Sequence, residues 1–97
     1  MFCVFLKFSA HKARAPQHVA AHKEWLEQGF SDGVLLLSGS LADSQGGLLL
    51  VHNTTLESLQ QRLARDPFVA QDVVTAEITP FVPHRADARL QFLVEQT

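Results

Sequence analysis

The sequence predicts an α+β fold with the element order strand, helix, strand, strand, helix, strand. Apolar residues recur with the period of an amphipathic helix in two segments, residues 15–30 and 56–65. Short apolar or alternating runs, typical of strands, occupy four others: residues 2–8, 34–37, 48–51 and 73–81. This order, with both helices on one side of an antiparallel sheet, is the ferredoxin-like βαββαβ arrangement.

The first strand and the first helix follow from apolar patterning. Residues 2–8 are apolar on both faces apart from Lys7, so both faces of this strand should be covered. In residues 15–30, at about 100° per residue, one helix face carries His18 at its edge and, along its centre, Val19, His22, Trp25, Leu26 and Phe30. Gly29 or Gly33 should end the helix, because glycine tolerates the left-handed conformation found there.

The second helix is bounded by residues that favour helix ends. Thr54, followed three residues later by Glu57, is the pattern of a capping box. Asp66 directly before Pro67 should break the helix, and the same aspartate can cap a short helix over residues 67–71.

The remaining strands complete the sheet. Residues 34–37 and 48–51 are joined by the turn-rich segment 43–47, which predicts a hairpin. Residues 73–81 alternate, as expected of a strand with one more polar face.

The patterning also predicts a homodimer. Two helices can cover only one face of the sheet, yet three of the four predicted strands are apolar on both faces. A single copy would expose a broad apolar surface to water, and a second copy packed sheet on sheet would cover it. The tail, residues 83–97, carries four apolar residues that should dock on the partner or on the sheet edge, namely Leu90, Phe92, Leu93 and Val94.

Length and composition set the broad class. At 97 residues and 10.8 kDa we expect one domain over residues 1–97, with its core in about 2–82. Eight basic and ten acidic residues give a nearly neutral balance, so nucleic acid is not an expected partner.

The single cysteine, Cys3, favours a reducing, cytoplasmic location. Residues 1–8 lack a basic region and contain Lys7, which predicts neither a signal peptide nor a membrane span.

His22 is the main chemical candidate. An imidazole on an apolar helix face can be a core histidine bonded to a backbone carbonyl. It can also give and take protons near neutral pH, and a carboxylate on its second nitrogen would fix its tautomer and raise its basicity. Asp66 is the candidate carboxylate, although on local signals alone it could serve only as a helix cap.

A metal site is not expected. His18 and His22 are four residues apart, a spacing at which two imidazoles can share one metal ion. The HExxH pattern needs a glutamate directly after His18, where the chain has Val19. The other histidines stand at no recognised motif spacing.

Four segments together resemble the YCII-related family of the dimeric α/β-barrel superfamily, over about residues 2–81. They are HKEWL from His22, residues 33–39, Asp66-Pro67-Phe68 and residues 74–81. The resemblance implies a dimeric ferredoxin-like fold with His22 and Asp66 as the catalytic pair. This chain has Ser40 where such proteins often have proline, and His18 where they have arginine, so pocket shape and substrate charge should differ. A similar protein removes chloride from a chlorinated hydroxyhydroquinone.

The sequence therefore leads to two hypotheses. The first is a small homodimeric enzyme without cofactor, in which His22, oriented by Asp66, is a general acid/base for elimination, dehalogenation or isomerisation of a small hydroxylated or carbonyl-bearing molecule. Residues expected to contact the substrate are His18, Trp25, Ser38, Gly39, Ser40 and Phe68. The alternative is a non-catalytic metabolite-binding or accessory module of the same fold. Expected partners are a second copy and a small molecule, with no nucleic acid and no membrane.

Overall fold

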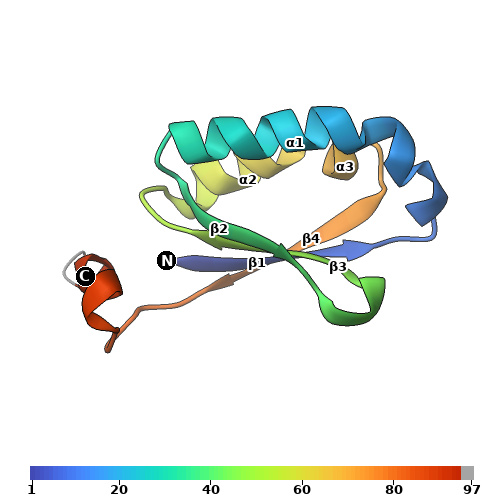
Figure 1. The fold of residues 1–97 in the computed structure, drawn as a ribbon. Coiled ribbons are helices and arrows are strands. Elements are labelled where there is room, and N and C mark those ends of the chain that lie inside the picture. The colour runs from blue at the N-terminus through green and yellow to red at the C-terminus, as the bar shows by residue number, and fades with distance from the viewer. Residues whose placement is uncertain (95–97) are drawn as a thin grey trace.

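The protein folds as a four-stranded antiparallel sheet with its main helices on one face (Figure 1). The structure is a computed structural model and describes residues 1–94. The strands, in the sheet order β2-β3-β1-β4, are β1 (Phe2–Phe8), β2 (Leu35–Ser40), β3 (Gly46–Val51) and β4 (Val74–Pro80). The helices are α1 (Ala15–Ser31), α2 (Leu56–Ala64), α3 (Pro67–Ala70) and α4 (Gln91–Val94), with short 3-10 turns η1 (Lys12–Arg14), η2 (Ala42–Ser44) and η3 (Ala88–Leu90). The predicted α+β, ferredoxin-like fold is confirmed.

The core lies between the sheet and the helices. Alternate strand residues point toward the helix layer and are buried, as the pleat of a strand requires. The buried apolar cluster consists of Val4, Leu6, Val34, Leu35, Leu49, Val51, Leu59, Leu63, Val73 and Val74. Within the described residues, no helix is both long enough and apolar enough to cross a membrane.

A β-bulge in β2 decides which of its side chains face the helices. Leu35 pairs with Val51, but Leu37 pairs with Leu50, so the register shifts between them. The extra residue reverses the alternation of side chains beyond it. Ser38 and Leu49 are partners, and partners share a face, so Ser38 and Ser40 point to the helix side.

The β2–β3 hairpin is longer than predicted, reaching Ser40 on one side and starting at Gly46 on the other. Gly46 has φ +136°, and a Cβ there would lie 1.9 Å from the backbone oxygen of Leu6 in β1. Only glycine allows this close approach of two strands.

The apolar stripe of α1 is narrower than predicted. Val19 and Phe30 are 36% and 42% exposed, and they lie at the margins of the face that packs on the sheet. Gly29 sits at the centre of that face and is buried against the Leu35 side chain, so the helix approaches the sheet closely there. The helix ends at Ser31, and Gly33, which has φ +75°, rather than Gly29 provides the left-handed residue that follows its cap.

The predicted capping box of α2 is wrong by one residue. Thr55, not Thr54, has extended backbone angles, and its Oγ1 accepts a hydrogen bond from the Ser58 N–H at 3.1 Å. Glu57 then stands one position too early to close a capping box. A threonine cap is present, but the reciprocal bond is not.

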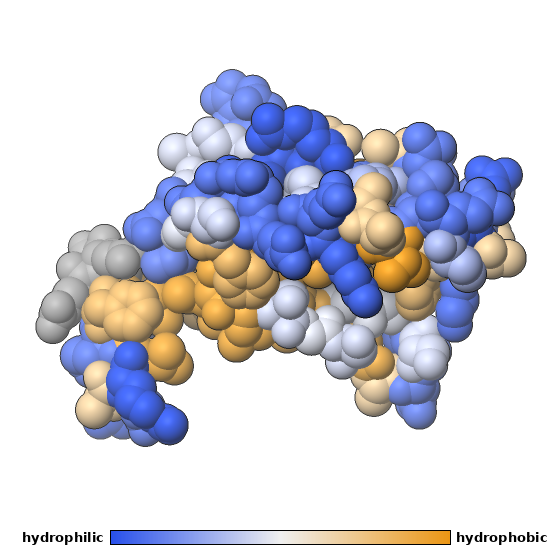
Figure 2. Space-filling view, turned by 45° about the horizontal axis from the view of Figure 1, so that its top comes forward, coloured by the Kyte–Doolittle hydropathy of each residue, from blue (hydrophilic) through white to orange (hydrophobic). Residues whose placement is uncertain are grey.

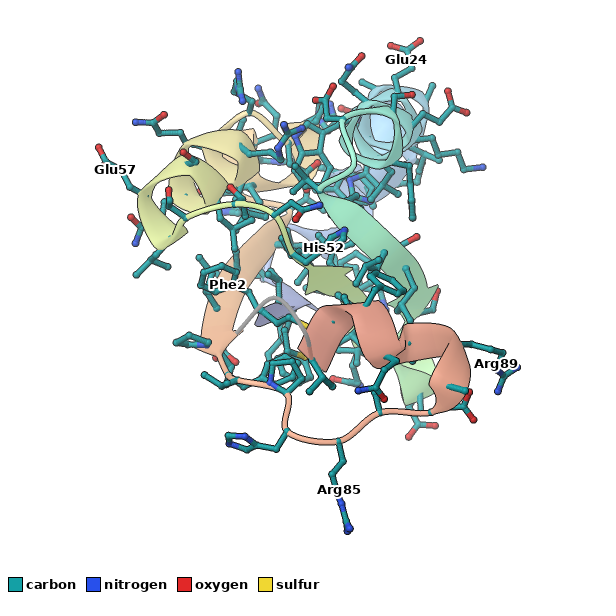
Figure 3. All side chains as sticks on the ribbon, turned by 90° about the vertical axis from the view of Figure 1, so that its left-hand side faces the viewer. Phe2, Glu24, His52, Glu57, Arg85 and Arg89 are labelled. Atoms are coloured by element: carbon teal, nitrogen blue, oxygen red, sulfur yellow. The ribbon has the colours of Figure 1, made fainter. Side chains whose placement is uncertain are left out.

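The tail crosses to the open side of the sheet. After β4 the chain runs away from the body, and α4 lies below the sheet, on the side opposite to α1 and α2 (Figures 1 and 3). There Leu93 is buried and the Phe92 ring meets His52 edge-on, with centroids 6.2 Å apart. The prediction places the tail on a partner or on the sheet edge, whereas in the structure it packs beneath one end of the sheet. Residues 95–97 of the predicted tail lie outside the described residues.

The open face of the sheet is apolar over three strands. Cys3, Phe5, Leu48 and Leu50 are only half-buried there, and Leu37 is 46% exposed. On β4 the same face carries polar residues. Figure 2, which turns the helix layer toward the viewer and the open face away, shows hydrophobic surface at the C-terminal segment and on the neighbouring side of the body, beneath the polar helix layer.

Candidate functional site

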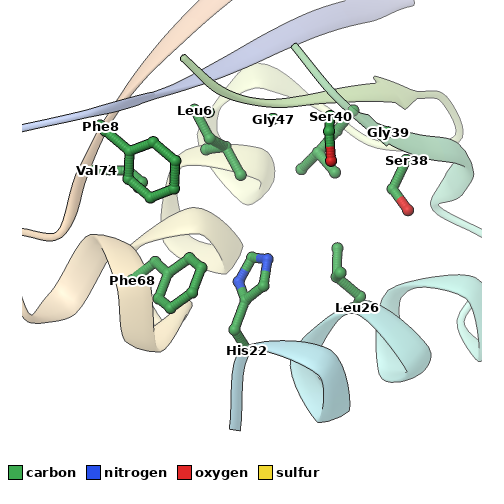
Figure 4. A pocket seen from close by; sticks show the side chains of 12 residues that line it. Leu6, Phe8, His22, Leu26, Ser38, Gly39, Ser40, Gly47, Phe68 and Val74 are labelled. Atoms are coloured by element: carbon green, nitrogen blue, oxygen red, sulfur yellow. The ribbon is translucent and has the colours of Figure 1, made fainter. Parts of the chain in front are cut away.

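A cavity of about 290 Å³ lies between the sheet and the helix layer (Figure 4). Its walls are mostly apolar or glycine, and its polar side chains come from α1 and β2. The lining residues are Leu6, Phe8, His22, Leu26, Ser38, Gly39, Ser40, Gly46, Gly47, Leu49, Phe68 and Val74. A space of this size, at the small end of ligand pockets, suits a molecule of roughly one ring.

His22 projects into this cavity from α1 (Figure 4). Its Nδ1 lies 2.7 Å from Oδ1 of Asp66, so the two candidates, 44 residues apart in the chain, are in contact. A carboxylate oxygen can only accept a hydrogen bond, and Nδ1 therefore carries the proton. Whenever the ring is neutral, Nε2 therefore has the free lone pair and can act as a base.

Asp66 holds His22 from a fully buried position. It is 0% exposed, and its Oδ1 also accepts a hydrogen bond from the Phe68 N–H at 3.1 Å, which caps α3 as predicted. Oδ2 is buried with no hydrogen-bond partner among residues 1–94. Since Asp66 does not line the cavity, any proton exchanged with a ligand passes through His22.

Two aromatic rings fix the plane of the His22 ring. Phe68 stacks on it with centroids 4.1 Å apart and an interplanar angle of 11°, and Trp25 stacks at 6.1 Å and 20°. The imidazole side chain is only 15% exposed. Stacking and the Asp66 hydrogen bond together leave the ring little freedom to rotate, which is the preorganisation that acid/base chemistry requires.

Ser38 and Ser40 provide hydroxyl groups on the wall contributed by β2 (Figure 4). They reach the cavity because of the bulge in that strand. The adjacent wall is formed by the backbone of Gly39, Gly46 and Gly47. Gly47 pairs with Leu6 and Ser40, which face the helices, so its missing side chain leaves space in the cavity. The polar groups of the cavity are thus a ring nitrogen and two hydroxyls.

The structure does not bring two of the predicted contact residues to the cavity. His18 is half-buried on α1 but does not line it. Trp25 also does not line it, because its indole N–H donates to the backbone oxygen of Arg62 at 3.0 Å and the ring closes a different cleft. Trp25 therefore supports His22 rather than forming the wall.

Other lining residues were not singled out from the sequence. Leu6, Leu49 and Val74 belong to the inward face of the sheet, so strand alternation could have identified them as residues beneath His22. Leu26, one turn beyond His22, follows from the helical period. Gly46 and Gly47 were interpreted only as a turn, and nothing in their sequence indicates a cavity wall.

Across the described part of the chain, no three side chains of the metal-ligating types His, Cys, Asp and Glu come together. His18 and His22 therefore lack a third protein ligand there.

Comparisons with known proteins identify relatives of this chain. The sequence model of the YCII-related domain matches residues 1–82. Among solved structures, the fold is similar to 5-chloro-2-hydroxyhydroquinone dehydrochlorinase from Burkholderia phenoliruptrix, determined in complex with 2,5-dihydroxybenzoquinone. The TM-score is 0.70 at 15% identity, over 82% of this chain and 91% of that one. No protein with a curated description matches.

Proposed function

Because the chain belongs to the YCII-related family, we propose that it is a small enzyme that uses His22 as a general acid/base on a small hydroxylated or carbonyl-bearing organic molecule. The observation that carries this proposal is the 2.7 Å bond from His22 Nδ1 to the buried Asp66 carboxylate, which leaves Nε2 free in an apolar cavity. Positioned acid/base groups of this kind contribute about 10²- to 10⁴-fold to a rate.

The reaction class we propose is elimination or isomerisation. Nε2 of His22 takes a proton from the substrate, and Asp66 stabilises the positive charge that forms on the ring. In an isomerisation the same ring returns the proton to another atom. In an elimination the leaving group departs as an anion with its bonding electron pair, and His22 releases the proton to solvent. Neither route requires an electron acceptor.

The substrate class follows from the cavity and from the solved neighbour. That neighbour is named a dehydrochlorinase of a hydroxylated ring and was determined with a dihydroxylated quinone. In this chain Ser38 and Ser40 offer hydroxyls to such oxygen substituents, while Leu6, Phe8 and Leu49 suit the flat faces of a ring. Halogenated hydroquinones and quinones are therefore the first compounds to test, followed by lactones.

The test compares wild type with His22→Asn. Asparagine places an N–H close to the position of Nδ1, so the bond to Asp66 can persist while Nε2 is lost. We expect wild type to convert at least one compound and the variant to be slower by about 10²-fold or more. Equal turnover by both proteins would disprove the role of His22. Binding of the compounds by wild type without turnover would favour the metabolite-binding module.

We also propose a homodimer formed through the open face of the sheet. The apolar residues Phe5, Leu48 and Leu50 are only half-buried in one copy. One copy exposes 6159 Å² of surface, against about 5500 Å² for a typical folded chain of this mass. Leu50→Lys should yield a monomer in sedimentation at micromolar concentration, whereas Thr79→Lys, on the polar margin of the same face, should not. A monomeric wild type would refute the dimer.

A further inference from the structure

A second cleft, of about 350 Å³, lies between α1 and α2. Trp25 and Gln28 come from α1, and Asp32 directly follows that helix. Arg62 lies in the last turn of α2, and Arg65 directly follows it. None of the five lines the cavity that holds His22. The two helices lie side by side above the sheet (Figure 3). The cleft between their ends is open to solvent.

The cleft carries one uncompensated positive charge. Asp32 accepts hydrogen bonds from Gln28 Nε2 at 2.8 Å and from Arg62 Nη2 at 3.0 Å. These two hydrogen bonds hold the pKa of Asp32 below its usual value, so its carboxylate is ionised and neutralises Arg62. The guanidinium of Arg65 has no hydrogen-bond or ion-pair partner among residues 1–94. Arg65 acts on the Asp32 carboxylate only through its charge, so the two arginines and one carboxylate leave the cleft with one net positive charge.

Trp25 gives the same cleft an apolar wall. Its only donor, the indole N–H, is already bonded to the Arg62 backbone oxygen, so the ring offers its surface and no hydrogen bond. A planar guanidinium can bind a carboxylate through two parallel hydrogen bonds. The cleft therefore combines a receptor for one oxyanion with a flat hydrophobic surface.

We propose that this cleft is a second ligand site, which takes a small organic monocarboxylate with a planar apolar body. Arg65 pairs with the carboxylate and Trp25 contacts the ring. A single surplus positive charge is neutralised by a singly charged anion, whereas a phosphate dianion would leave the occupied cleft with a net negative charge. This site does not depend on the chemistry proposed for His22.

The chain contains its own probe, because Trp25 is its only tryptophan. Benzoate titrated into the full-length protein should change tryptophan fluorescence saturably. Arg65→Gln should weaken benzoate binding by about tenfold or more, as loss of a charge-assisted hydrogen bond predicts. Arg65→Lys, which keeps the charge but loses the planar fork, should bind with intermediate affinity. Arg85→Gln is the matched control, since Arg85 points away from the body (Figure 3) and should bind as wild type does.

Three results would overturn the proposal. One is the absence of a saturable fluorescence change with benzoate. Another is equal affinity of wild type and Arg65→Gln, which would mean that benzoate enters the His22 cavity or binds elsewhere. The third is equal affinity for benzyl alcohol or for inorganic phosphate, since the first lacks the carboxylate and the second lacks the planar body. Circular dichroism of each variant confirms that it is folded.

Discussion

The carboxylate of Asp66 joins His22 to the first turn of α3 through a single atom. Oδ1 accepts from His22 Nδ1 at 2.7 Å and from the Phe68 N–H at 3.1 Å, while the residue is fully buried. The helix cap therefore holds the carboxylate in place, and the carboxylate in turn orients the imidazole. Substitutions of Asp66 can separate its structural role from its role toward the ring.

Asp66→Asn should keep most of the stability and lose activity. An amide oxygen can accept both hydrogen bonds, and the amide nitrogen would take the place of Oδ2, which has no partner among the described residues. We expect the free energy of unfolding to fall by about 1 to 2 kcal/mol, because the buried amide N–H groups find no acceptor there. Without the negative charge, a protonated His22 is no longer stabilised, and kcat/KM should fall about tenfold or more. Urea unfolding and steady-state kinetics measure the two effects.

Asp66→Ala is the matched comparison, because it removes both hydrogen bonds. Loss of the cap and of a charge-assisted bond should destabilise the protein by about 2 to 4 kcal/mol. If Asp66→Asn and Asp66→Ala destabilise the protein equally, the hydrogen bonds of Oδ1 do not contribute to its stability. If Asn retains full activity, the charge of Asp66 has no role in the reaction.

The fold could be predicted because its signals are local and repeated. Strand alternation in β4 and apolar runs in β1 and β3 were enough to order the elements. The cap of α2 was misplaced because Thr54 and Thr55 are chemically equivalent in sequence, and only the backbone angles select Thr55. The width of the α1 stripe depended on the close packing of Gly29, which a periodicity argument cannot detect.

The site was predicted less completely, for geometric reasons. His22 and Asp66 were identified from residue type together with family resemblance, and they do meet. Trp25 was expected in the cavity wall, but its N–H bond to Arg62 depends on where α2 ends relative to α1. The second cleft was missed because its charges come from the ends of two separate helices. Only the packed structure shows that Asp32 forms an ion pair with Arg62, while Arg65 forms none among residues 1–94.

Ser38→Ala and Ser40→Ala should weaken substrate binding. Both hydroxyls line the cavity, where they can bond to oxygen substituents of the ligand. Loss of one such bond should raise KM about twofold to tenfold and leave kcat nearly unchanged, because neither hydroxyl exchanges the proton. Ser58→Ala, on α2 and outside the cavity, is the control. A drop in kcat with unchanged KM would contradict a pure binding role.

Gly46→Ala should be among the most destabilising small substitutions in this chain. Its Cβ would lie 1.9 Å from the Leu6 oxygen, and φ is +136°. A backbone oxygen and a backbone angle cannot move aside as a side chain could. We therefore expect the free energy of unfolding to fall by about 3 kcal/mol or more. At Gly39 a Cβ would meet nothing within 4 Å, so Gly39→Ala should change the free energy of unfolding by less than about 1 kcal/mol. Denaturant titration of both variants measures these changes. If Gly46→Ala leaves the free energy of unfolding nearly unchanged, the close approach of β1 and β3 is contradicted.

Acid should destabilise the protein through His52, on which the tail packs. His52 is 8% exposed, and burial lowers the pKa of its ring below the usual 6.5. The unfolded chain therefore takes up this proton at a higher pH than the folded chain. Above about pH 6.5 the titration of His52 leaves the free energy of unfolding unchanged. Below this pH, and down to the pKa of the folded protein, it lowers the free energy of unfolding by at most about 1.4 kcal/mol per pH unit. His52→Gln should flatten this slope in urea unfolding at pH 7.5 to 5, and the exposed His84→Gln should retain it. Equal slopes in wild type and His52→Gln would show that other groups cause the acid sensitivity.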